Sequence, residues 1–221
     1  MKILIVEDDT ELAAAIAKVV EQAGWLAETC GDGGEAAFLG ATESYDAAVV
    51  DLGLPVQDGI SVIRHWREQG RDFPVLILTA RHRWSDKLAG FSSGADDYLT
   101  KPVQLEEVTL RLSALLRRAR GHGDAVLRVG PLELDTVAQR FLFEGAPLTL
   151  TAQEHRILAY LMHHAGEVVS RTQIGEHVYA RDLEPDSNTV DVLIGRIRKK
   201  LGTPLIHTER GMGFRLAVQD S

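Results

Sequence analysis

The sequence has very little cysteine, since Cys30 is the single cysteine among 221 residues. One cysteine excludes an internal disulfide framework and a zinc site built from several cysteines. The chain also lacks any apolar run close to the roughly 18 residues that a membrane-spanning helix requires. Its N-terminal apolar run is too short for a signal peptide and leads directly into acidic residues. These absences predict a soluble, cytoplasmic protein that does not contact a membrane.

The composition shows no extreme bias either. Hydrophobic residues make up 45% of the chain and charged residues 25%, which is ordinary for a globular protein. At roughly 150 residues per domain, the length predicts one or two domains. The net charge of −8 argues weakly against nucleic-acid binding, but a local basic face would be sufficient for such binding.

The first half of the chain alternates short apolar runs with amphipathic stretches, a pattern typical of an α/β fold. Short runs rich in Val, Ile and Leu suit strands that are buried on both faces of a parallel sheet. A succession of such units predicts a five-stranded, doubly wound parallel sheet. The expected strands are Ile3–Val6, Trp25–Thr29, Ala47–Val50, Val75–Leu78 and Asp97–Thr100, and the expected helices are residues 10–23, 34–40, 59–69, 85–92 and 105–119.

The pattern changes at residues 119–125, where apolar periodicity stops and glycine appears. We expect a linker there, between a first domain over residues 1–118 and a second over residues 126–221. Short β-like runs over residues 126–149, separated by turn residues, predict a small antiparallel sheet. Helical patterns and a Gly-tipped hairpin follow, so we expect the second domain to be α+β. These later elements are Ala152–His164, Arg171–Val178, Asn188–Leu201 and the hairpin Pro204–Val218.

Polar side chains follow the expected strands of the first domain at the points where these strands end. Glu7 and Asp8 follow the first strand, and Asp51 follows the third. Thr79 and Lys101 follow the fourth and the last. Ligands bind outside the carboxyl ends of the strands in an open α/β sheet, so we expect these residues to meet in one crevice. Crowded carboxylates suit Mg²⁺, and a hydroxyl and an ammonium group opposite them suit a phosphoryl group.

The motifs around these positions together resemble a bacterial receiver domain, which has a flavodoxin-like fold. They are Val6-Glu7-Asp8-Asp9, Asp51-Leu52-Gly53-Leu54-Pro55-Val56-Gln57-Asp58-Gly59, Leu78-Thr79-Ala80-Arg81 and Gly94-Ala95-Asp96-Asp97-Tyr98-Leu99-Thr100-Lys101-Pro102. The resemblance implies that Asp51 accepts a phosphoryl group from a sensor histidine kinase. It also implies that Mg²⁺ is held by Glu7, Asp8 and Asp51, together with the backbone carbonyl of Gly53. Such a protein is not an enzyme in the usual sense, although it assists its own phosphorylation and dephosphorylation.

The same resemblance implies roles for the remaining polar residues of the crevice. Thr79 and Lys101 would bind the phosphoryl oxygens, and Tyr98 would be a switch that moves inward when Thr79 is drawn to the phosphate. Another class with an aspartyl nucleophile is the Mg²⁺-dependent phosphohydrolase. Its haloacid dehalogenase type carries a second Asp two positions after the nucleophile as general acid, where this chain has Gly53.

In the second half, the helix expected over Asn188–Leu201 has an apolar stripe for burial and a mixed strip opposite to it. The strip consists of Thr189, Val192, Arg196 and Lys199, with Lys200 beside it. Such a strip suits the major groove, because arginine reads guanine edges, lysine meets phosphates and valine can touch a thymine methyl group. With the preceding helix and the following hairpin, the pattern predicts a winged helix-turn-helix.

This half resembles the effector domain of the OmpR/PhoB subfamily over nearly its whole length. The motifs are Leu148-Thr149-Leu150-Thr151-Ala152-Gln153-Glu154, Val168-Val169-Ser170-Arg171, Val190-Asp191-Val192, Arg196-Ile197-Arg198-Lys199-Lys200-Leu201 and Thr208-Glu209-Arg210-Gly211-Met212-Gly213-Phe214-Arg215-Leu216. The resemblance implies a transcription regulator that binds direct-repeat half-sites in promoter DNA, and whose loop Tyr179–Ser187 can touch RNA polymerase. The implied DNA contacts are Asn188, Thr189, Val192, Arg196, Lys199, Lys200, Thr208 and Arg210.

Charges of alternating sign in the first half also fit this subfamily, in which such a face joins two phosphorylated protomers as a symmetric homodimer. The implied pairs between protomers are Lys87 with Glu107, Asp97 with Arg111 and Asp96 with Arg118. An alternative at this point is a regulator with the same fold that binds DNA independently of phosphorylation.

Four residues depart from the subfamily pattern. Leu54 and Val103 stand where methionine and an aromatic residue are commoner, and both remain apolar. Gly195 falls inside the expected recognition helix and should weaken it by roughly 0.5–1 kcal/mol relative to alanine. Glu209 places an acid on the wing, close to where DNA phosphates would lie. Gly195 and Glu209 predict an altered sequence preference or a weaker affinity for DNA.

Overall fold

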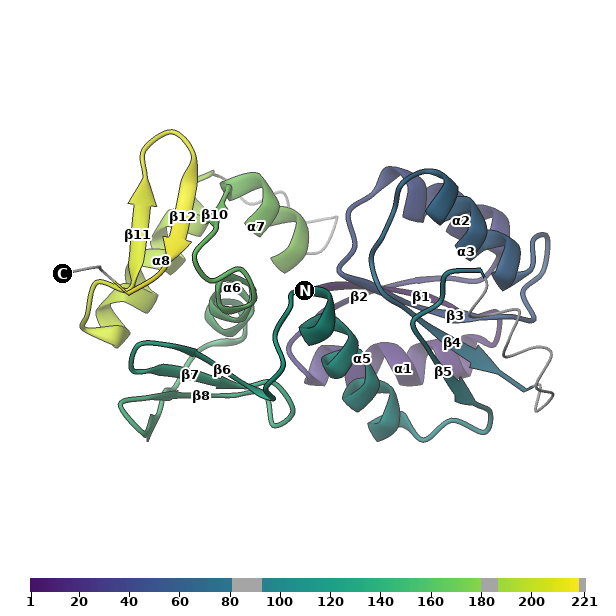
Figure 1. Ribbon diagram of the computed structural model, residues 1–221, viewed down its shortest axis with the longest axis horizontal. Coiled ribbons are helices and arrows are strands. Elements are labelled where there is room, and N and C mark those ends of the chain that lie inside the picture. Colours follow the sequence, from purple (N-terminus) through teal and green to yellow (C-terminus); the bar gives the residue numbers. More distant parts are fainter. Residues whose placement is uncertain (81–92, 180–186, 219–221) are drawn as a thin grey trace. The chain divides into compact units, whose positions relative to one another are not determined.

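A computed structural model describes residues 1–80, 93–179 and 187–218, and for residues 187 and 188 it describes the backbone alone (Figure 1). The chain forms two compact units. We call residues Lys2–Ala119 the N-terminal unit, and residues Arg120–Ser221, with which Met1 is grouped, the C-terminal unit.

The N-terminal unit is built on a five-stranded parallel sheet with the strand order β2-β1-β3-β4-β5. The strands are β1 (Lys2–Val6), β2 (Leu26–Cys30), β3 (Ala47–Asp51), β4 (Val75–Thr79) and β5 (Asp97–Thr100). Every residue of β1, β3 and β4 is buried, which explains why these strands read as continuous apolar runs. The chain reverses its direction of winding between β1 and β3, so the carboxyl ends of these two strands are where a ligand site is expected.

Helices cover both faces of this sheet, with α1 and α5 on one face and α2 and α3 on the other (Figure 1). They are α1 (Thr10–Gln22), α2 (Gly33–Thr42), α3 (Gly59–Glu68) and α5 (Leu105–Ala119). Aspartates at 9, 32 and 58 cap the first three of these helices by accepting hydrogen bonds from first-turn backbone N–H groups. This arrangement confirms the predicted doubly wound fold, while the helix expected over residues 85–92 lies outside the described residues.

The packing of α2 on α3 depends on one close approach. Trp66 of α3 is fully buried, and its indole Nε1 donates a hydrogen bond of 3.0 Å to the Ala36 carbonyl on α2. A Cβ atom at Gly40 would lie 2.2 Å from that nitrogen, so glycine is the residue that permits this contact. Trp66 is therefore closely packed between α2 and α3.

The C-terminal unit contains two antiparallel sheets and three described helices. One sheet has the order β6-β7-β8-β9 and the other has the order β10-β12-β11. The strands are β6 (Val126–Val129), β7 (Leu132–Asp135), β8 (Arg140–Phe143), β9 (Ala146–Pro147), β10 (Val168–Val169), β11 (Ile206–Glu209) and β12 (Gly213–Leu216). The helices are α6 (Ala152–His163), α7 (Arg171–Val178) and α8 (Ser187–Leu201). This is the predicted α+β winged-helix arrangement, with the short strand β10 added to the terminal hairpin.

The added strand β10 is accommodated by a glycine in the hairpin. Gly213 has φ +151, and a Cβ atom there would lie 2.0 Å from the carbonyl oxygen of Val169 on β10. Only a residue without a side chain allows the two strands to pair at this point.

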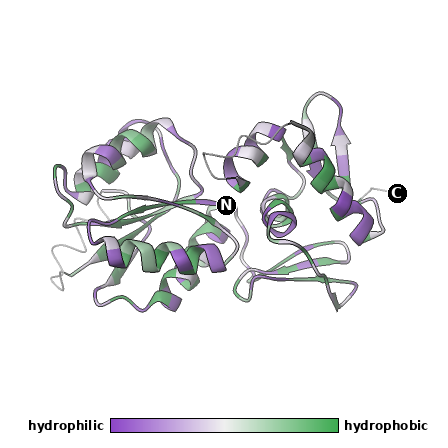
Figure 2. Cartoon of the chain, turned by 180° about the vertical axis from the view of Figure 1, so that it is seen from behind, coloured by the Kyte–Doolittle hydropathy of each residue, from purple (hydrophilic) through white to green (hydrophobic). Residues whose placement is uncertain are grey.

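In both units, the helices carry hydrophobic residues along one side and hydrophilic residues along the other (Figure 2). This is the pattern of helices that cover a core and face solvent on the opposite side. No helix within the described ranges combines the length and the apolar character that crossing a membrane requires.

Candidate functional site

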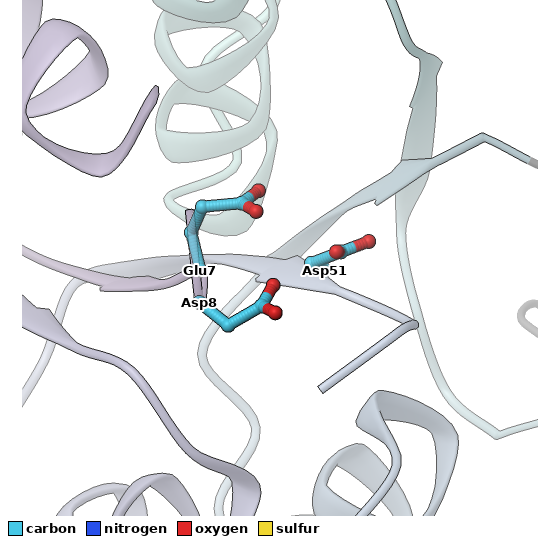
Figure 3. Close-up of side chains that lie close together, drawn as sticks. All are labelled: Glu7, Asp8 and Asp51. Atoms are coloured by element: carbon cyan, nitrogen blue, oxygen red, sulfur yellow. The ribbon is translucent and has the colours of Figure 1, made fainter. Parts of the chain in front are cut away.

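Three carboxylates gather at the carboxyl ends of β1 and β3 (Figure 3). Glu7 and Asp8 follow β1 directly, and Asp51 is the last residue of β3. Each offers one oxygen, and these oxygens all lie within 4.8 Å of one another. Glu7 and Asp51 are buried, with 2% and 8% of their surfaces exposed, while Asp8 is exposed to solvent. The site is therefore a partly buried acidic cluster with Asp8 on its solvent-exposed side.

A single lysine offsets part of this negative charge. The Nζ atom of Lys101 lies 2.7 Å from a carboxylate oxygen of Glu7 and 3.0 Å from Asp51 Oδ2. Burial raises the pKa of Glu7, and the charge of Asp51 acts in the same direction, against the lowering effect of Lys101. Burial works to lower the pKa of Lys101, but its hydrogen bonds to Glu7 and Asp51 outweigh burial, and its pKa is raised. The site has more negative charge than Lys101 compensates, which favours a bound cation.

The residue types suit Mg²⁺ in particular, because it prefers oxygen ligands and keeps several of its waters. Glu7, Asp8 and Asp51 supply carboxylate oxygens, and Asp8 is exposed to solvent. Gly53 lies beside them, since a Cβ atom there would be 3.5 Å from Asp51 Oδ2. Among the described residues, this is the one group of acidic, histidine or cysteine side chains with a spacing that could hold a metal ion.

Thr79 and Tyr98 lie on the neighbouring strands. Thr79 ends β4, which pairs with β3 so that Asp51 stands opposite Leu78, and it is 3% exposed. Tyr98 lies on β5, is half-buried and packs against the hydrophobic cluster beneath α2 and α3. The structure thus brings Glu7, Asp8, Asp51 and Lys101 into direct proximity and places Thr79 at the adjoining strand end.

Four of the residues expected at a dimer face, Asp96, Asp97, Glu107 and Arg111, form ion pairs within the single chain. Arg111 contacts Asp97 at 2.8 Å and Glu107 at 2.6 Å, and its bond to Asp97 is the main reason why its pKa is raised. Asp96 pairs with Arg67 at 3.3 Å. Arg118 donates a hydrogen bond to a backbone carbonyl of its own helix, and Lys87 lies outside the described residues.

In the C-terminal unit, α8 buries one side and exposes the other. The buried stripe consists of Val190, Leu193, Ile194, Ile197 and Leu201. Val192, which is 52% exposed, lies with Arg196 and Lys199 on the solvent side, and Thr189 is partly exposed. Within the described part of the chain, the side chains of Arg196 and Lys199 contact no carboxylate. The Asn188 side chain and the acidic loop after Tyr179 fall outside what the structure describes.

Lys200, beside this exposed strip, has partners within the protein. Its Nζ contacts Glu154 Oε2 at 2.7 Å and the backbone carbonyl of Thr149 at 3.0 Å. Glu154 is 2% exposed, and although burial works to raise its pKa, the bonds from Lys200 and Thr151 lower it. Lys200 therefore anchors α8 to the start of α6, because the buried carboxylate needs a partner.

On the wing, two of the expected residues have partners within the protein. Thr208 Oγ1 accepts a hydrogen bond of 2.7 Å from Arg198, so its hydroxyl is held in place. Glu209 forms an ion pair with Arg215 on the adjacent strand, which offsets the acidic charge that the sequence placed near DNA. Arg210 is exposed at the tip of the hairpin.

Sequence reasoning did not identify the clamp that fixes α8 relative to α7 and the wing. Arg171 at the start of α7 donates two hydrogen bonds of 2.8 Å to Asp191 on α8, and they lower the pKa of Asp191. The guanidinium of Arg171 lies over the Phe214 ring of β12, 4.7 Å from its centre. Arg198 of α8 donates to the Ile206 carbonyl on β11 at 2.9 Å. Although Arg171 and Asp191 both occur in the motifs, their separation along the chain gave no sign that they pair.

Two family models match the chain in order. Residues 3–113 match the response regulator receiver domain, and residues 145–216 match the C-terminal domain of transcriptional regulatory proteins. The expected acidic site belongs to the first match and the strip on α8 to the second.

Similar proteins span nearly the whole chain. The two-component response regulator PhoP of Pseudomonas aeruginosa is 44% identical, over 97% of this chain and 97% of its own length. The transcriptional regulatory protein PrrA of Mycobacterium tuberculosis is 40% identical, over 99% of this chain and 97% of its own. Among solved structures, the receiver domain of the Francisella response regulator 1452 is 39% identical, with a TM-score of 0.52 and coverage of 53% of this chain and 98% of that one.

The matched domains occur in the expected order, and the similarity extends over both of them. The chain therefore belongs to the OmpR/PhoB subfamily of two-component response regulators and is a phosphorylation-activated, DNA-binding regulator of transcription.

Proposed function

We propose that Asp51 is the phosphoacceptor and that Glu7, Asp8, Thr79 and Lys101 serve its phosphorylation. The observation that carries this proposal is the cluster of three carboxylates with the Lys101 ammonium at the carboxyl ends of β1 and β3. In the reaction, a carboxylate oxygen of Asp51 attacks the phosphorus of a phosphohistidine on the kinase, and the histidine ring leaves with its electron pair. Little covalent work is left for the protein beyond positioning and charge stabilisation.

The carboxylates have a second task, which is to hold Mg²⁺. Receiver domains bind Mg²⁺ in their acidic pocket, and the oxygen donors of Glu7, Asp8 and Asp51 fit this ion. We assign the fourth protein ligand to the carbonyl of Gly53. When bound, the ion supplies positive charge that neutralises the transferring phosphoryl group.

Lys101 and Thr79 would then hold the phosphoryl oxygens on Asp51. Lys101 already contacts Asp51 Oδ2 at 3.0 Å, so its ammonium is close to where a phosphoryl group on Asp51 would lie. Thr79 at the neighbouring strand end supplies a hydroxyl donor. Tyr98, half-buried on β5, is the residue that we expect to change position when Thr79 is engaged. The same residues would assist hydrolysis of the acyl phosphate, which limits how long the signal lasts.

We propose that the output is binding of promoter DNA by a phosphorylated homodimer. Thr189, Val192, Arg196 and Lys199 form the exposed strip of α8, with Asn188 at its start, and Arg210 extends from the wing. Direct-repeat half-sites on the DNA require freedom between the two domains, which we assign to a linker at residues 119–125 between residues 1–118 and 126–221.

The dimer face would consist of Asp96, Asp97, Glu107, Arg111 and Arg118, with Lys87. Exchanging the ion pairs of Arg111 within the chain for pairs between protomers would make the association sensitive to small shifts of β5 and α5. The loop Tyr179–Ser187 is the candidate contact with RNA polymerase. All of this activity would occur in the cytoplasm.

Intact-mass measurement tests the chemistry directly. The chain is incubated with Mg²⁺ and a small acyl-phosphate donor, beside the variant Asp51→Asn. We expect one phosphoryl adduct on the wild type and none on the variant or in the presence of a chelator. If the folded wild type stayed unmodified, a regulator that binds DNA independently of phosphorylation would be the better description.

A further inference from the structure

A glycine lies in the interior of the helix that faces DNA. Gly195 is near the middle of α8 (Ser187–Leu201) and is exposed to solvent. Glycine is among the least favourable residues at such a position, because it loses the most backbone freedom when the helix forms. A glycine in a helix interior therefore calls for a specific reason.

The described part of the chain supplies no such reason. Gly195 is not among the residues with positive φ, so its backbone conformation is open to any residue. A Cβ atom at this position would meet nothing within 4 Å. Gly40 and Gly213 are different, since a Cβ atom at either would collide with a neighbouring element. Within the described part of the chain nothing opposes a side chain at 195, so we look for the reason in a partner that binds this face of α8.

The position of Gly195 on the helix indicates what that external factor is. Residues three and four apart are neighbours on a helix surface. Val192 and Lys199, both exposed, lie on one side of Gly195 as its neighbours on the DNA-facing strip. On its other side, Asp191 is held by Arg171 and Arg198 is held by the Ile206 carbonyl and Thr208. Gly195 thus leaves the helix backbone without a side chain between the exposed strip and two side chains that are held by hydrogen bonds.

We infer that Gly195 is a specificity-determining residue for DNA. It leaves the backbone of α8 uncovered where the helix faces the major groove, so that the helix can lie close to the base edges. Glycine serves in this way wherever a backbone must approach a ligand closely. A side chain at 195 would push the helix away from the groove and would change which base pairs Val192 and Arg196 reach. The inference rests on the DNA-binding function of α8. It identifies the residue that lets α8 lie close to the base edges in the major groove.

The test uses the full chain after incubation with Mg²⁺ and a small acyl-phosphate donor. A duplex is first selected from a random library with the wild-type protein and serves as the probe. Gly195→Ala and Gly195→Leu are compared with Gln153→Leu, which adds an exposed leucine on a different helix, α6. Thermal unfolding is recorded for every variant, because both replacements at 195 are better helix formers than glycine.

We expect Gly195→Leu to melt at a higher temperature than the wild type and yet to bind the selected duplex at least about tenfold more weakly. Its binding to a scrambled duplex at low salt should stay within about twofold, because phosphate contacts carry that affinity. The affinity of Gly195→Ala for the selected duplex should lie between those of Gly195→Leu and the wild type. Gln153→Leu should bind this duplex like the wild type. A new selection with Gly195→Leu should enrich a different base at one or more positions.

A purely structural role predicts the opposite correlation, in which binding improves as the helix becomes more stable. If Gly195→Leu bound the selected duplex as the wild type does and enriched the same sequence, the inference would be wrong. If the wild type enriched no sequence at all, the assignment of the strip on α8 would fail first, and the role of Gly195 with it.

Discussion

At the residue scale, Glu7 contributes its charge to the acidic site at a cost to the stability of the fold. Glu7 is almost completely buried, and its carboxylate shares the Lys101 ammonium with Asp51. Burial is the largest influence on Glu7 and raises its pKa. The ionised form of Glu7 is therefore a cost to the folded state when no cation is bound.

This cost has a definite pH dependence. A carboxyl group with a raised pKa in the folded state destabilises the fold as pH rises from the ordinary value of 4.5 through the raised value. In metal-free buffer, Glu7→Gln should raise the melting temperature at neutral pH, and the gain should shrink as pH falls towards 4.5. Thermal unfolding across this range measures the difference. A gain that did not change with pH would show that the charge of Glu7 is not its source.

Val56 is a second residue whose conformation carries a cost. It has φ +66, which is unfavourable for a β-branched residue, and it is 88% exposed. The N–H of Gln57 donates to the Pro55 carbonyl at 2.8 Å, so Val56 lies at the centre of a tight three-residue turn. Nothing in the described structure compensates for the exposed apolar side chain.

Val56→Gly should therefore stabilise the N-terminal unit by about 1 kcal/mol, because glycine adopts positive φ without steric cost. Val56→Ala is the matched control, since it also removes the exposed methyl groups but retains Cβ, and it should give a much smaller gain. Urea unfolding followed by tryptophan fluorescence reports on this unit, because all three tryptophans of the chain fall within residues 2–119. Equal gains from both variants would assign the effect to the exposed methyl groups and not to the backbone.

At the element scale, α8 uses neighbouring lysines for different purposes. Lys199 is exposed on the DNA-facing strip, whereas Lys200 reaches the buried carboxylate of Glu154 on α6. The clamp of Arg171 and Asp191 fixes the same helix from its other side. The helix is thus oriented by polar anchors on its flanks as well as by its buried stripe, and this orientation decides which side chains face DNA.

The two lysines should respond differently to the same substitution. Lys199→Ala should leave stability unchanged, weaken binding to all DNA sequences and reduce the salt dependence of binding. Lys200→Ala should lower the stability of the C-terminal unit by about 1–3 kcal/mol, because it removes the charged partner of a buried carboxylate. It should leave the salt dependence of DNA binding unchanged.

Paired measurements of unfolding and of DNA binding against salt separate these effects. The pKa of Glu154 is lowered, so the stability lost in Lys200→Ala should be present above the ordinary value of 4.5 and fade as pH falls below it. A loss of DNA affinity in Lys200→Ala without a loss of stability would return Lys200 to the DNA-binding strip.

At the scale of the whole molecule, a phosphorylation event in one unit must alter the activity of another unit that has its own core. The N-terminal unit presents Asp97, Glu107 and Arg111 as an ion-paired network on β5 and α5. Exposed ion pairs contribute little stability by themselves. Such pairs can therefore be exchanged for equivalent pairs with a second protomer at small cost, and this suits a reversible dimer.

Phosphorylation should accordingly shift the chain from monomer to dimer. We expect light scattering at micromolar concentrations to report a doubled mass after treatment with Mg²⁺ and the acyl-phosphate donor, while Asp51→Asn stays monomeric. Added salt should weaken the dimer, because its face is charged. A fully phosphorylated chain that remained monomeric at high micromolar concentration would contradict the proposed dimer.

Much of the architecture is contained in local sequence patterns. The runs that became β1, β3 and β4 are apolar because both faces of a parallel sheet are buried, and this is visible in any window of a few residues. The ends of these strands carry Glu7, Asp51 and Thr79, and their meeting at one edge follows from the parallel topology. The acidic site was therefore predictable from the sequence, as was the burial of the stripe on α8.

Only the tertiary structure decided how side chains of similar chemistry divide their tasks. Lys199 and Lys200 are the same residue type at adjacent positions, but only Lys200 contacts the buried carboxylate of Glu154, which is distant along the chain. Arg215 offsets Glu209, and the strand β10 becomes a strand through pairing with β12. Periodicity records which face of an element is apolar, because burial repeats with the element itself. It does not record which distant group a polar side chain meets, because that is set when separate elements pack together.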